Sequence, residues 1–189
     1  METTINGIKV FESFLSEEDC SELLKKITDE AHWEQAAIGK YENDKVSHSE
    51  INLQFRDIEV SPFEDTTLVE INRKLEKLYD HIKSSFQISG FTFGEFMFSK
   101  YKLNSHIKPH SDTGIYSTNR LITCVLYLND LFEGGELYFP DFDYEYKPKK
   151  GGIITFWSEY SHGVKKLVLG ERYCIVFFAR SVSSPTLFN

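Results

Sequence analysis

The sequence has few cysteines and no long hydrophobic run. Its three cysteines, Cys20, Cys124 and Cys174, are odd in number and widely spaced, which argues against a disulfide framework. We expect three buried thiols in a reducing compartment. The first ten residues, METTINGIKV, lack the basic and apolar segments of a secretory signal, and no apolar stretch approaches the length needed to span a membrane. These absences predict a cytoplasmic protein without a membrane partner.

Positive charge is also scarce. The chain has 21 Lys and Arg against 29 Asp and Glu, which gives a net charge of -8. Nucleic acids and anionic membranes are bound by basic surfaces, so we expect no nucleic-acid partner. The one basic cluster, residues 147–150, reads as a solvated loop.

The composition is that of a folded chain. Of its 189 residues, 41% are hydrophobic and 15% are aromatic, which is enough apolar surface for a core. We therefore predict a single domain over residues 1–189, present as a monomer.

The two halves of the chain differ in pattern. In residues 1–90, Ser16 reads as an N-cap, and Cys20, Leu23, Leu24, Ile27 and Ala31 follow at helical spacing. A second helix is predicted over about residues 66–86, with one apolar stripe. The stripe consists of Leu68, Ile71, Leu75, Leu78, Tyr79, Ile82 and Phe86. Residues 34–56, between the helices, are polar and weakly patterned.

From residue 91 onward the sequence favours short strands separated by turns. Gly134-Gly135, Gly151-Gly152 and Gly170 mark several of those turns. The predicted strands are 91–103, 120–129, 135–140, 143–148, 152–157, 162–167 and 171–180. Many short strands after helices indicate a mainly β, α+β fold, either a jelly roll or a barrel, with helices packed on one side. The pattern does not choose between the two.

His110, Asp112 and His162 are candidate metal ligands. His110 and Asp112 are two residues apart, so on a strand their side chains would point to the same face. His162 stands at the start of another predicted strand. Two imidazoles and one carboxylate leave three coordination positions open, which is typical of non-heme Fe(II) oxygenases. A structural zinc site would be closed by four protein ligands, and the cysteines are not grouped to close one.

Arg172 is a candidate anion-binding residue. Along residues 171–180, the side chains of Arg172, Cys174, Val176 and Phe178 share one strand face, and a closed β-fold would bury it. A buried arginine needs an anionic partner because an unpaired buried charge is very costly. A dicarboxylate could supply that partner, since the guanidinium fork binds a carboxylate through two hydrogen bonds.

These residues, in this order, resemble the 2-oxoglutarate oxygenases, and within them both the collagen-type and the hypoxia-sensing prolyl 4-hydroxylases. Further similarity lies in Arg120–Asn129, in Gly134–Leu137 and in Phe156–Ser158. The resemblance covers about residues 91–180 and is weaker upstream. It implies a double-stranded β-helix (jelly-roll) core at residues 91–180, with N-terminal helices packed on one sheet and a substrate-side loop within residues 1–90.

The resemblance also implies the chemistry. It implies Fe(II) held by His110, Asp112 and His162, with 2-oxoglutarate and O2 as cosubstrates and ascorbate as a candidate accessory cofactor. The cosubstrate would be bound by Arg172, Tyr127, Tyr101 and Thr123. The implied reaction couples oxidative decarboxylation of 2-oxoglutarate to succinate with hydroxylation of a C–H bond, on a proline-containing peptide or protein. Asp112 argues against a halogenase, because in that branch a small residue takes its place.

Three departures from the family pattern affect substrate prediction. Asn104 stands where many members have glycine, Ile107 where many have a second tyrosine, and Phe178 where hypoxia-sensing members have tryptophan. Two alternatives therefore stay open. One is a hydroxylase of a free amino acid or another small molecule, and the other is a metal-binding jelly roll without turnover. We further predict that residues 36–56 and Tyr138–Asp143 flank the iron and contact the substrate.

Overall fold

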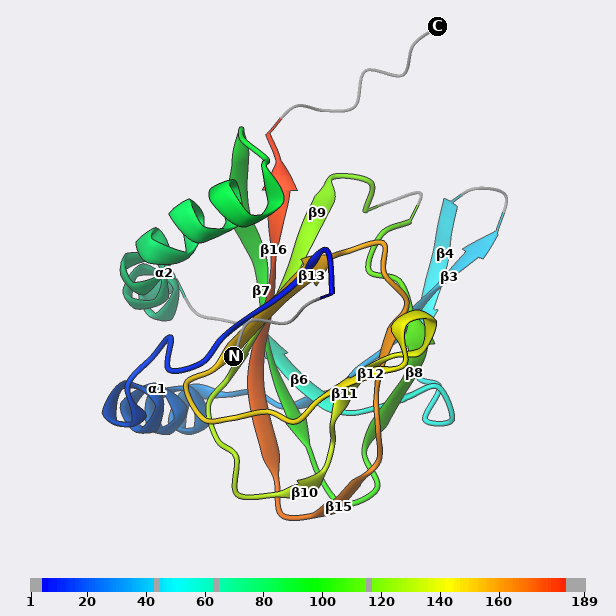
Figure 1. The fold of residues 1–189 in the computed structure, drawn as a ribbon. Coiled ribbons are helices and arrows are strands. Elements are labelled where there is room, and N and C mark those ends of the chain that lie inside the picture. The colour runs from blue at the N-terminus through cyan, green and yellow to red at the C-terminus, as the bar shows by residue number, and fades with distance from the viewer. Residues whose placement is uncertain (1–4, 43–44, 63–64, 115–116, 183–189) are drawn as a thin grey trace, which may run out of the picture.

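Two facing antiparallel β-sheets, with two helices outside them, form the molecule in a computed structural model (Figure 1). The structure describes residues 5–42, 45–62, 65–114 and 117–182, and it leaves the side chains of residues 40–48 and 63–74 undescribed. One buried cluster contains residues of both sheets, among them Tyr127 of the larger and Phe139 of the smaller. Two separate sheets that face each other across a shared core form a β-sandwich and not a closed barrel, and the expected mainly β, jelly-roll fold class is confirmed.

The larger sheet supplies the rigid wall behind the site. Within the described residues it has seven strands in the order β1-β13-β9-β16-β7-β6-β2. They are β1 (Ile8–Phe11), β13 (Ile153–Trp157), β9 (Arg120–Tyr127), β16 (Arg172–Ser181), β7 (Phe91–Tyr101), β6 (Glu59–Pro62) and β2 (Glu34–Gln35).

The smaller sheet lies opposite and has the order β12-β11-β14-β8-β5. Its strands are β12 (Tyr144–Tyr146), β11 (Leu137–Phe139), β14 (His162–Val164), β8 (His106–His110) and β5 (Arg56–Asp57). Two further pairs are β3 (Ile38–Glu42) with β4 (Lys45–Glu50), and β10 (Glu133–Gly134) with β15 (Leu167–Leu169). A 3-10 turn, η1 (Pro140–Phe142), joins β11 to β12.

Both predicted helices are confirmed. In α1 (Glu17–Glu30) the hydroxyl of Ser16 accepts a hydrogen bond from the backbone N–H of Asp19 at 3.0 Å, which caps the first turn. α2 (Asp65–Phe86) buries Leu75, Leu78, Ile82 and Phe86. The side chains of Leu68 and Ile71, predicted in the same stripe, lie outside the described residues. The two helices lie side by side against the outer face of the larger sheet (Figure 1).

The central strand β16 separates two environments. Ile175, Phe177 and Ala179 belong to the cluster under the helices. Arg172, Cys174, Val176 and Phe178 instead line a cavity between the sheets. The period-2 alternation of the strand therefore aims one set of side chains at the core and the other at the site, and both sets follow the predicted alternation.

The first half of the chain is less helical than predicted. Residues 1–90 contain β1 to β6 as well as the two helices, and residues 34–56 include the β3–β4 hairpin. These strands are two to six residues long, too short for a recognisable alternation, and most pair with distant segments. β8 was also missing from the predicted strands, for the same reason.

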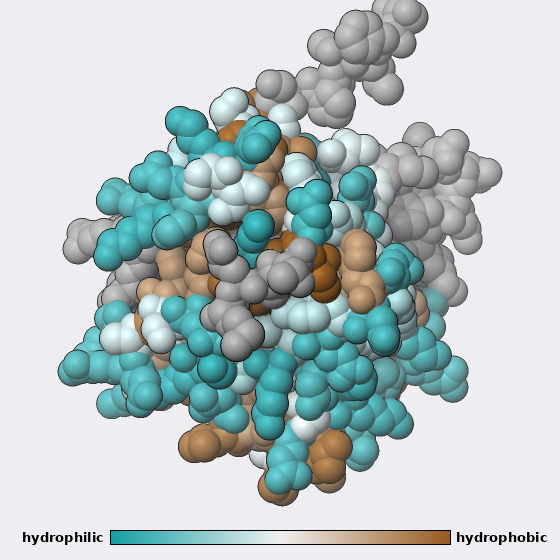
Figure 2. All heavy atoms as spheres, in the orientation of Figure 1, coloured by the Kyte–Doolittle hydropathy of each residue, from teal (hydrophilic) through white to brown (hydrophobic). Residues whose placement is uncertain are grey.

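The visible surface is mainly hydrophilic (Figure 2). Hydrophobic side chains gather at its lower end, where Figure 1 places β10 and β15, and among the exposed residues there are Leu131, Val168 and Leu169. Within the described residues, no helix is both long and apolar enough to cross a lipid bilayer.

Candidate metal and cosubstrate site

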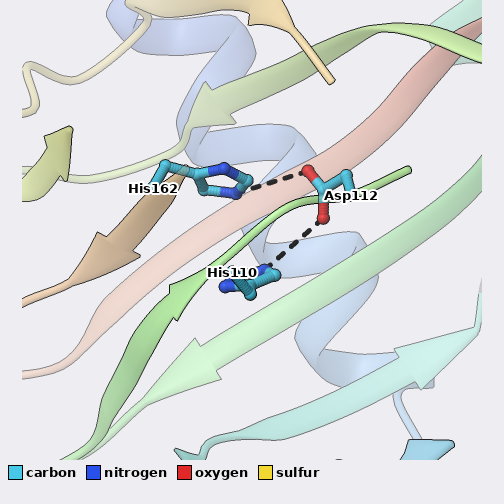
Figure 3. A group of neighbouring side chains, drawn as sticks. All are labelled: His110, Asp112 and His162. Atoms are coloured by element: carbon cyan, nitrogen blue, oxygen red, sulfur yellow. Dashed lines mark ion pairs between the residues drawn. The ribbon is translucent and has the colours of Figure 1, made fainter. Parts of the chain in front are cut away.

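Two histidines face each other across adjacent strands of the smaller sheet. His110 is the last residue of β8, and His162 is the first residue of β14 directly opposite it. Their ring centroids are 4.5 Å apart. Asp112 follows His110 and points between the two rings (Figure 3). One ligand atom from each of the three residues lies within 4.8 Å of the others, so a single metal ion could be held by all three.

Asp112 is not oriented by the strand alternation that was predicted. β8 ends at His110, so strand alternation does not orient the carboxylate. The backbone N–H of Asp112 instead donates to the carbonyl of Ser158 at 2.9 Å. The hydroxyl of Thr123 donates to Asp112 Oδ2 at 2.8 Å and lies 2.9 Å from the Ser158 hydroxyl. The loop after β8 is thus fixed by β9 and by the residue that follows β13.

Backbone carbonyls fix the orientation of both imidazoles. His110 Nδ1 lies 3.0 Å from the carbonyl oxygen of Lys108, and His162 Nδ1 lies 2.9 Å from that of Tyr160. A carbonyl only accepts, so Nδ1 carries the proton in each ring and Nε2 offers its lone pair to a metal. Both Nε2 atoms face Asp112, at 3.5 Å from His110 and 3.3 Å from His162. Hydrogen bonds of this kind orient histidine ligands and raise their basicity.

The surroundings shift the pKa of Asp112 and that of His162. Burial alone would raise the pKa of Asp112, but the charges and hydrogen bonds of His162 and His110 hold it well below its usual value. Burial opposes the charged form of His162, yet Asp112 raises the pKa of that imidazole. The carboxylate is therefore ionised and ready to bind a cation, and a metal must displace the proton that Asp112 favours on His162.

Arg172 lies in the same cavity with unsatisfied hydrogen-bond donors. It is only 1% exposed, and its Nη2 donates to the hydroxyl of Tyr127 at 3.2 Å. Its guanidinium lies 4.1 Å from the ring centroid of Tyr101, its partner across β16 and β7. Nε and Nη1 of Arg172 have no hydrogen-bond partner among the described residues. A buried cation with two free donors fits an anionic ligand.

A glycine creates the space for this arginine. Gly135 has φ +69°, a conformation that glycine adopts without strain. A Cβ atom built on it would lie 2.9 Å from Leu167 Cδ1 and 3.2 Å from Arg172 Cδ. The Gly134-Gly135 turn therefore lets the chain pass close to the aliphatic part of Arg172.

The cavity that joins these groups has a volume of about 460 Å³. It is lined by the three candidate metal ligands and by Arg172, Tyr101 and Thr123. Tyr127 is fully buried behind Arg172 and reaches the cavity only through its hydrogen bond. Thr123 was predicted as a cosubstrate contact, which stays a prediction; it lines the cavity, and its hydroxyl donates to Asp112.

The departures from the family pattern also lie at the cavity or beside it. Ile107 and Phe178 both line it. Asn104 has φ +70° in the turn before β8, a conformation that asparagine tolerates better than most residues other than glycine. Asparagine can therefore stand at a glycine position there without changing the turn.

The two segments predicted to contact substrate differ in whether they line the cavity or the outer groove. Five residues of the 36–56 segment line an outer groove that also contains the metal-site residues; they are Ala37, Ile38, Gly39, Phe55 and Arg56. No residue of Tyr138–Asp143 lines this groove or the cavity, and contact of that segment with substrate stays a prediction. Phe139 is fully buried instead, with its ring centroid 6.2 Å from that of His162. The hydrophobic Phe139 supports the metal site from within the core.

Sequence reasoning missed three residues of this region. Ser158 was noted in a family-like stretch without a role, although it anchors Asp112. Arg56 is the last residue of the predicted substrate segment, residues 36–56, but it was given no role of its own. Glu95, which lines the cavity and pairs with Arg120, could have been found only from a strand register.

Comparison with known proteins agrees with this geometry. Residues 96–180 match the 2OG-Fe(II) oxygenase superfamily. A PKHD-type hydroxylase of Prochlorococcus marinus (strain AS9601) is 32% identical over 123 residues, which are 59% of this chain and 55% of that protein. The chain spans about half the length of the first curated relatives it matches.

Solved structures share the fold over nearly the whole chain. A prolyl-4-hydroxylase of Pseudomonas putida superposes with a TM-score of 0.73 at 18% identity, covering 94% of each chain. A Trichoplax adhaerens prolyl hydroxylase, solved with a peptide fragment of the hypoxia inducible factor oxygen degradation domain, gives a TM-score of 0.72 at 16% identity. That match covers 93% of this chain and 84% of the other.

The jelly roll brings two histidines, one aspartate and a buried arginine into a single cavity, and two imidazoles with one carboxylate are the ligand set typical of non-heme Fe(II) sites. Residues 96–180 of the chain are similar to the 2OG-Fe(II) oxygenase superfamily, and the chain shares its fold with solved prolyl hydroxylases. The cofactor and cosubstrates of that family are Fe(II), 2-oxoglutarate and O2. The residues present fit them, because the donor set suits Fe(II) and the unsatisfied donors of Arg172 suit a carboxylate.

Proposed function

We propose that the protein is an Fe(II)- and 2-oxoglutarate-dependent prolyl 4-hydroxylase acting on a peptide or protein. The reaction consumes 2-oxoglutarate, O2 and a C–H bond, and it yields succinate, CO2 and the corresponding alcohol. The observation that carries the proposal is the sharing of one cavity by the His110–Asp112–His162 group and the unsatisfied guanidinium of Arg172. A zinc site of structural type would have a fourth protein ligand, and the described residues offer none.

Each residue has a separate task in this proposal. His110, Asp112 and His162 hold the metal, and bound Fe(II) supplies the redox chemistry that couples 2-oxoglutarate and O2 to hydroxylation. Arg172 binds the carboxylate at the far end of 2-oxoglutarate, assisted by Tyr127 and stacked on Tyr101. Thr123 and Ser158 orient Asp112. The buried surroundings of the cavity exclude water from the reacting groups.

The substrate assignment is supported by the related prolyl hydroxylases and by the outer groove. The groove reaches the metal-site residues from the surface, which suits an extended peptide. The second candidate is a hydroxylase of a free amino acid, favoured by a cavity large enough for a small substrate beside 2-oxoglutarate. We also propose a monomer in a reducing cytoplasmic compartment, supported by three buried cysteines without a disulfide.

Succinate formation tests the proposal. The protein should convert 2-oxoglutarate to succinate with Fe(II) and O2, and His162→Ala should abolish this conversion. Proline-containing peptides and free proline should then be incubated with the enzyme, with and without ascorbate, and examined by mass spectrometry for a gain of one oxygen. Absence of Fe(II)-dependent succinate formation with all of these substrates would contradict the proposed prolyl hydroxylase.

A further inference from the structure

Arg56 is a second arginine of the cavity, and the proposed function gives it no role. It lies on β5, paired with β8, and its partner across the strands is Ile107. Directly opposite residues of an antiparallel pair point to the same side of the sheet, and both Arg56 and Ile107 line the cavity. The arginine therefore projects toward the metal site from the strand beside the one that carries His110.

The guanidinium of Arg56 forms no ion pair with a described residue, although the charge of Asp112, which the proposed function assigns to the metal, attracts it. Its Nη2 contacts only the sulfur of Met97, at 3.7 Å, and its Nε is buried without a hydrogen-bond partner. No carboxylate of the described residues forms an ion pair with it. Burial is costly for an unpaired cation, and structural packing on a thioether does not offset that cost. The arrangement is that of a binding residue whose ligand is not part of the chain.

The other charges of the cavity already have partners. Glu95 accepts hydrogen bonds from Arg120 and also pairs with Arg180 Nε at 3.1 Å. In the proposed function Asp112 binds the metal and Arg172 binds 2-oxoglutarate. The described lining contains three arginines and two carboxylates, so it is positive by one charge although the chain carries -8. Fe(II) and the 2-oxoglutarate dianion cancel each other, so that excess remains when both are bound.

The position of Arg56 indicates the substrate rather than the cosubstrate. Arg172 lines only the inner cavity, whereas Arg56 lines both the cavity and the outer groove. The residues common to the two spaces are Arg56, Ile107, His110, Asp112 and Arg120. A substrate coming from the groove toward the metal must pass them. Arg56 contacts Met97, and the cavity wall also contains the apolar residues Val60, Pro62 and Val176.

We propose that Arg56 binds a carboxylate of the substrate. The substrate of this enzyme would then carry a negative charge close to the aliphatic group that is hydroxylated. This inference rests on the proposed function and extends it to the substrate. The carboxylate could be the terminal group of an amino acid or an acidic side chain next to the reacting residue of a peptide. Both sources present the same chemistry to the guanidinium.

Two pairs of neutral and charged probes distinguish the sources. N-acetyl-L-proline and N-acetyl-L-prolinamide differ only in the carboxylate of the reacting residue. The capped peptides acetyl-Gly-Pro-Asp-Gly-amide and acetyl-Gly-Pro-Asn-Gly-amide differ only in a neighbouring acidic side chain. Binding is measured by calorimetry on protein loaded with Mn(II) and saturated with 2-oxoglutarate, so that no turnover is needed.

We expect the charged member of at least one pair to bind about tenfold more tightly to the wild type, as a single charge-assisted contact would give. In Arg56→Gln and Arg56→Met the two members should bind within about threefold of each other. Arg56→Met has a side chain of similar length that suits the apolar wall, which keeps the test available if Arg56→Gln does not fold. Lys25→Gln, which removes an exposed positive charge from α1, should keep the full preference.

Three results would overturn the assignment. The first is a wild type that shows no charge preference, which includes a wild type that binds no probe. The second is an unchanged preference in both Arg56 variants, and the third is loss of 2-oxoglutarate binding in those variants. Failure of the wild type to bind 2-oxoglutarate in the presence of Mn(II) would instead contradict the proposed function itself.

Discussion

In the proposed function, different side chains of the cavity bind the metal and the cosubstrate. Arg172 contacts Tyr127 and Tyr101 but none of the three candidate ligands. Arg172→Ala should therefore weaken 2-oxoglutarate binding by about 30- to 150-fold, which corresponds to about 2–3 kcal/mol for a buried charge-assisted pair. Metal affinity should change by less than about threefold. Calorimetric titration of metal and of 2-oxoglutarate measures both, and equal losses would refute the separate roles.

Thr123 supports the metal indirectly, through its hydrogen bond to Asp112. Thr123→Val removes that bond with little change of shape, and it should lower metal affinity by about tenfold, as loss of a group that orients a ligand commonly does. Thr155→Val is the control, because Thr155 is equally buried on neighbouring β13 and does not contact the site. Competition with a fluorescent chelator would report the difference. A similar loss in both variants would mean that Thr123 is only structural.

The Asp112–His162 pair makes the stability of the metal-free protein depend on pH. The lowered pKa of Asp112 stabilises the fold above its ordinary value of 3.8, and this contribution is lost as the pH falls through the folded-state pKa. The raised pKa of His162 stabilises the fold below its ordinary value of 6.5, and this contribution is lost as the pH rises through the folded-state pKa.

The pair should therefore stabilise the chelated protein most between those two values. The urea midpoint should fall as the pH rises from about 6 to about 8, and Asp112→Asn should flatten that dependence. Unfolding curves in the presence of a chelator measure it. A wild-type curve that runs parallel to that of Asp112→Asn would show that the pair does not couple to folding.

Turns and strand ends bring the site together. Gly135 and Gly90 both have positive φ, +69° and +67°, but only Gly135 is crowded by Leu167 and Arg172. An alanine at either position strains the backbone by about 1 kcal/mol. Gly135→Ala should additionally displace Arg172 and weaken 2-oxoglutarate binding severalfold, whereas Gly90→Ala should leave that binding unchanged. Thermal unfolding and calorimetry on the two variants separate the effects; equal 2-oxoglutarate affinities would contradict the role of Gly135.

Long, strongly patterned elements could be predicted from sequence, and short ones could not. The helices at residues 17–30 and 65–86, and the strand face of Arg172, Cys174, Val176 and Phe178, follow from periodicity. β5 has two residues, and only its pairing with β8 gives Arg56 a place in the cavity. Asp112 similarly depends on Ser158, which is 46 positions away in the sequence. Contacts between distant segments leave no local pattern to read.

At the level of the whole molecule, an acidic chain encloses a positively charged cavity. The jelly roll makes this possible because its two sheets bury one face each, so that the arginines inside lie apart from the exposed acidic side chains, which water and salt screen. The sequence could indicate the three metal-binding residues and Arg172 as a set, through its similarity to a family. It could not indicate the free donors of Arg172 and Arg56, since their number depends on which neighbours the fold supplies.

The dependence of 2-oxoglutarate binding on metal tests the account most directly. If the three candidate ligands and Arg172 form one site, metal and cosubstrate must strengthen each other's binding by the same factor. Anaerobic calorimetry should show 2-oxoglutarate binding at least about tenfold more tightly with Fe(II) than in the presence of a chelator, and His162→Ala should remove the difference. Equal affinity with and without Fe(II) in the wild type would contradict the account.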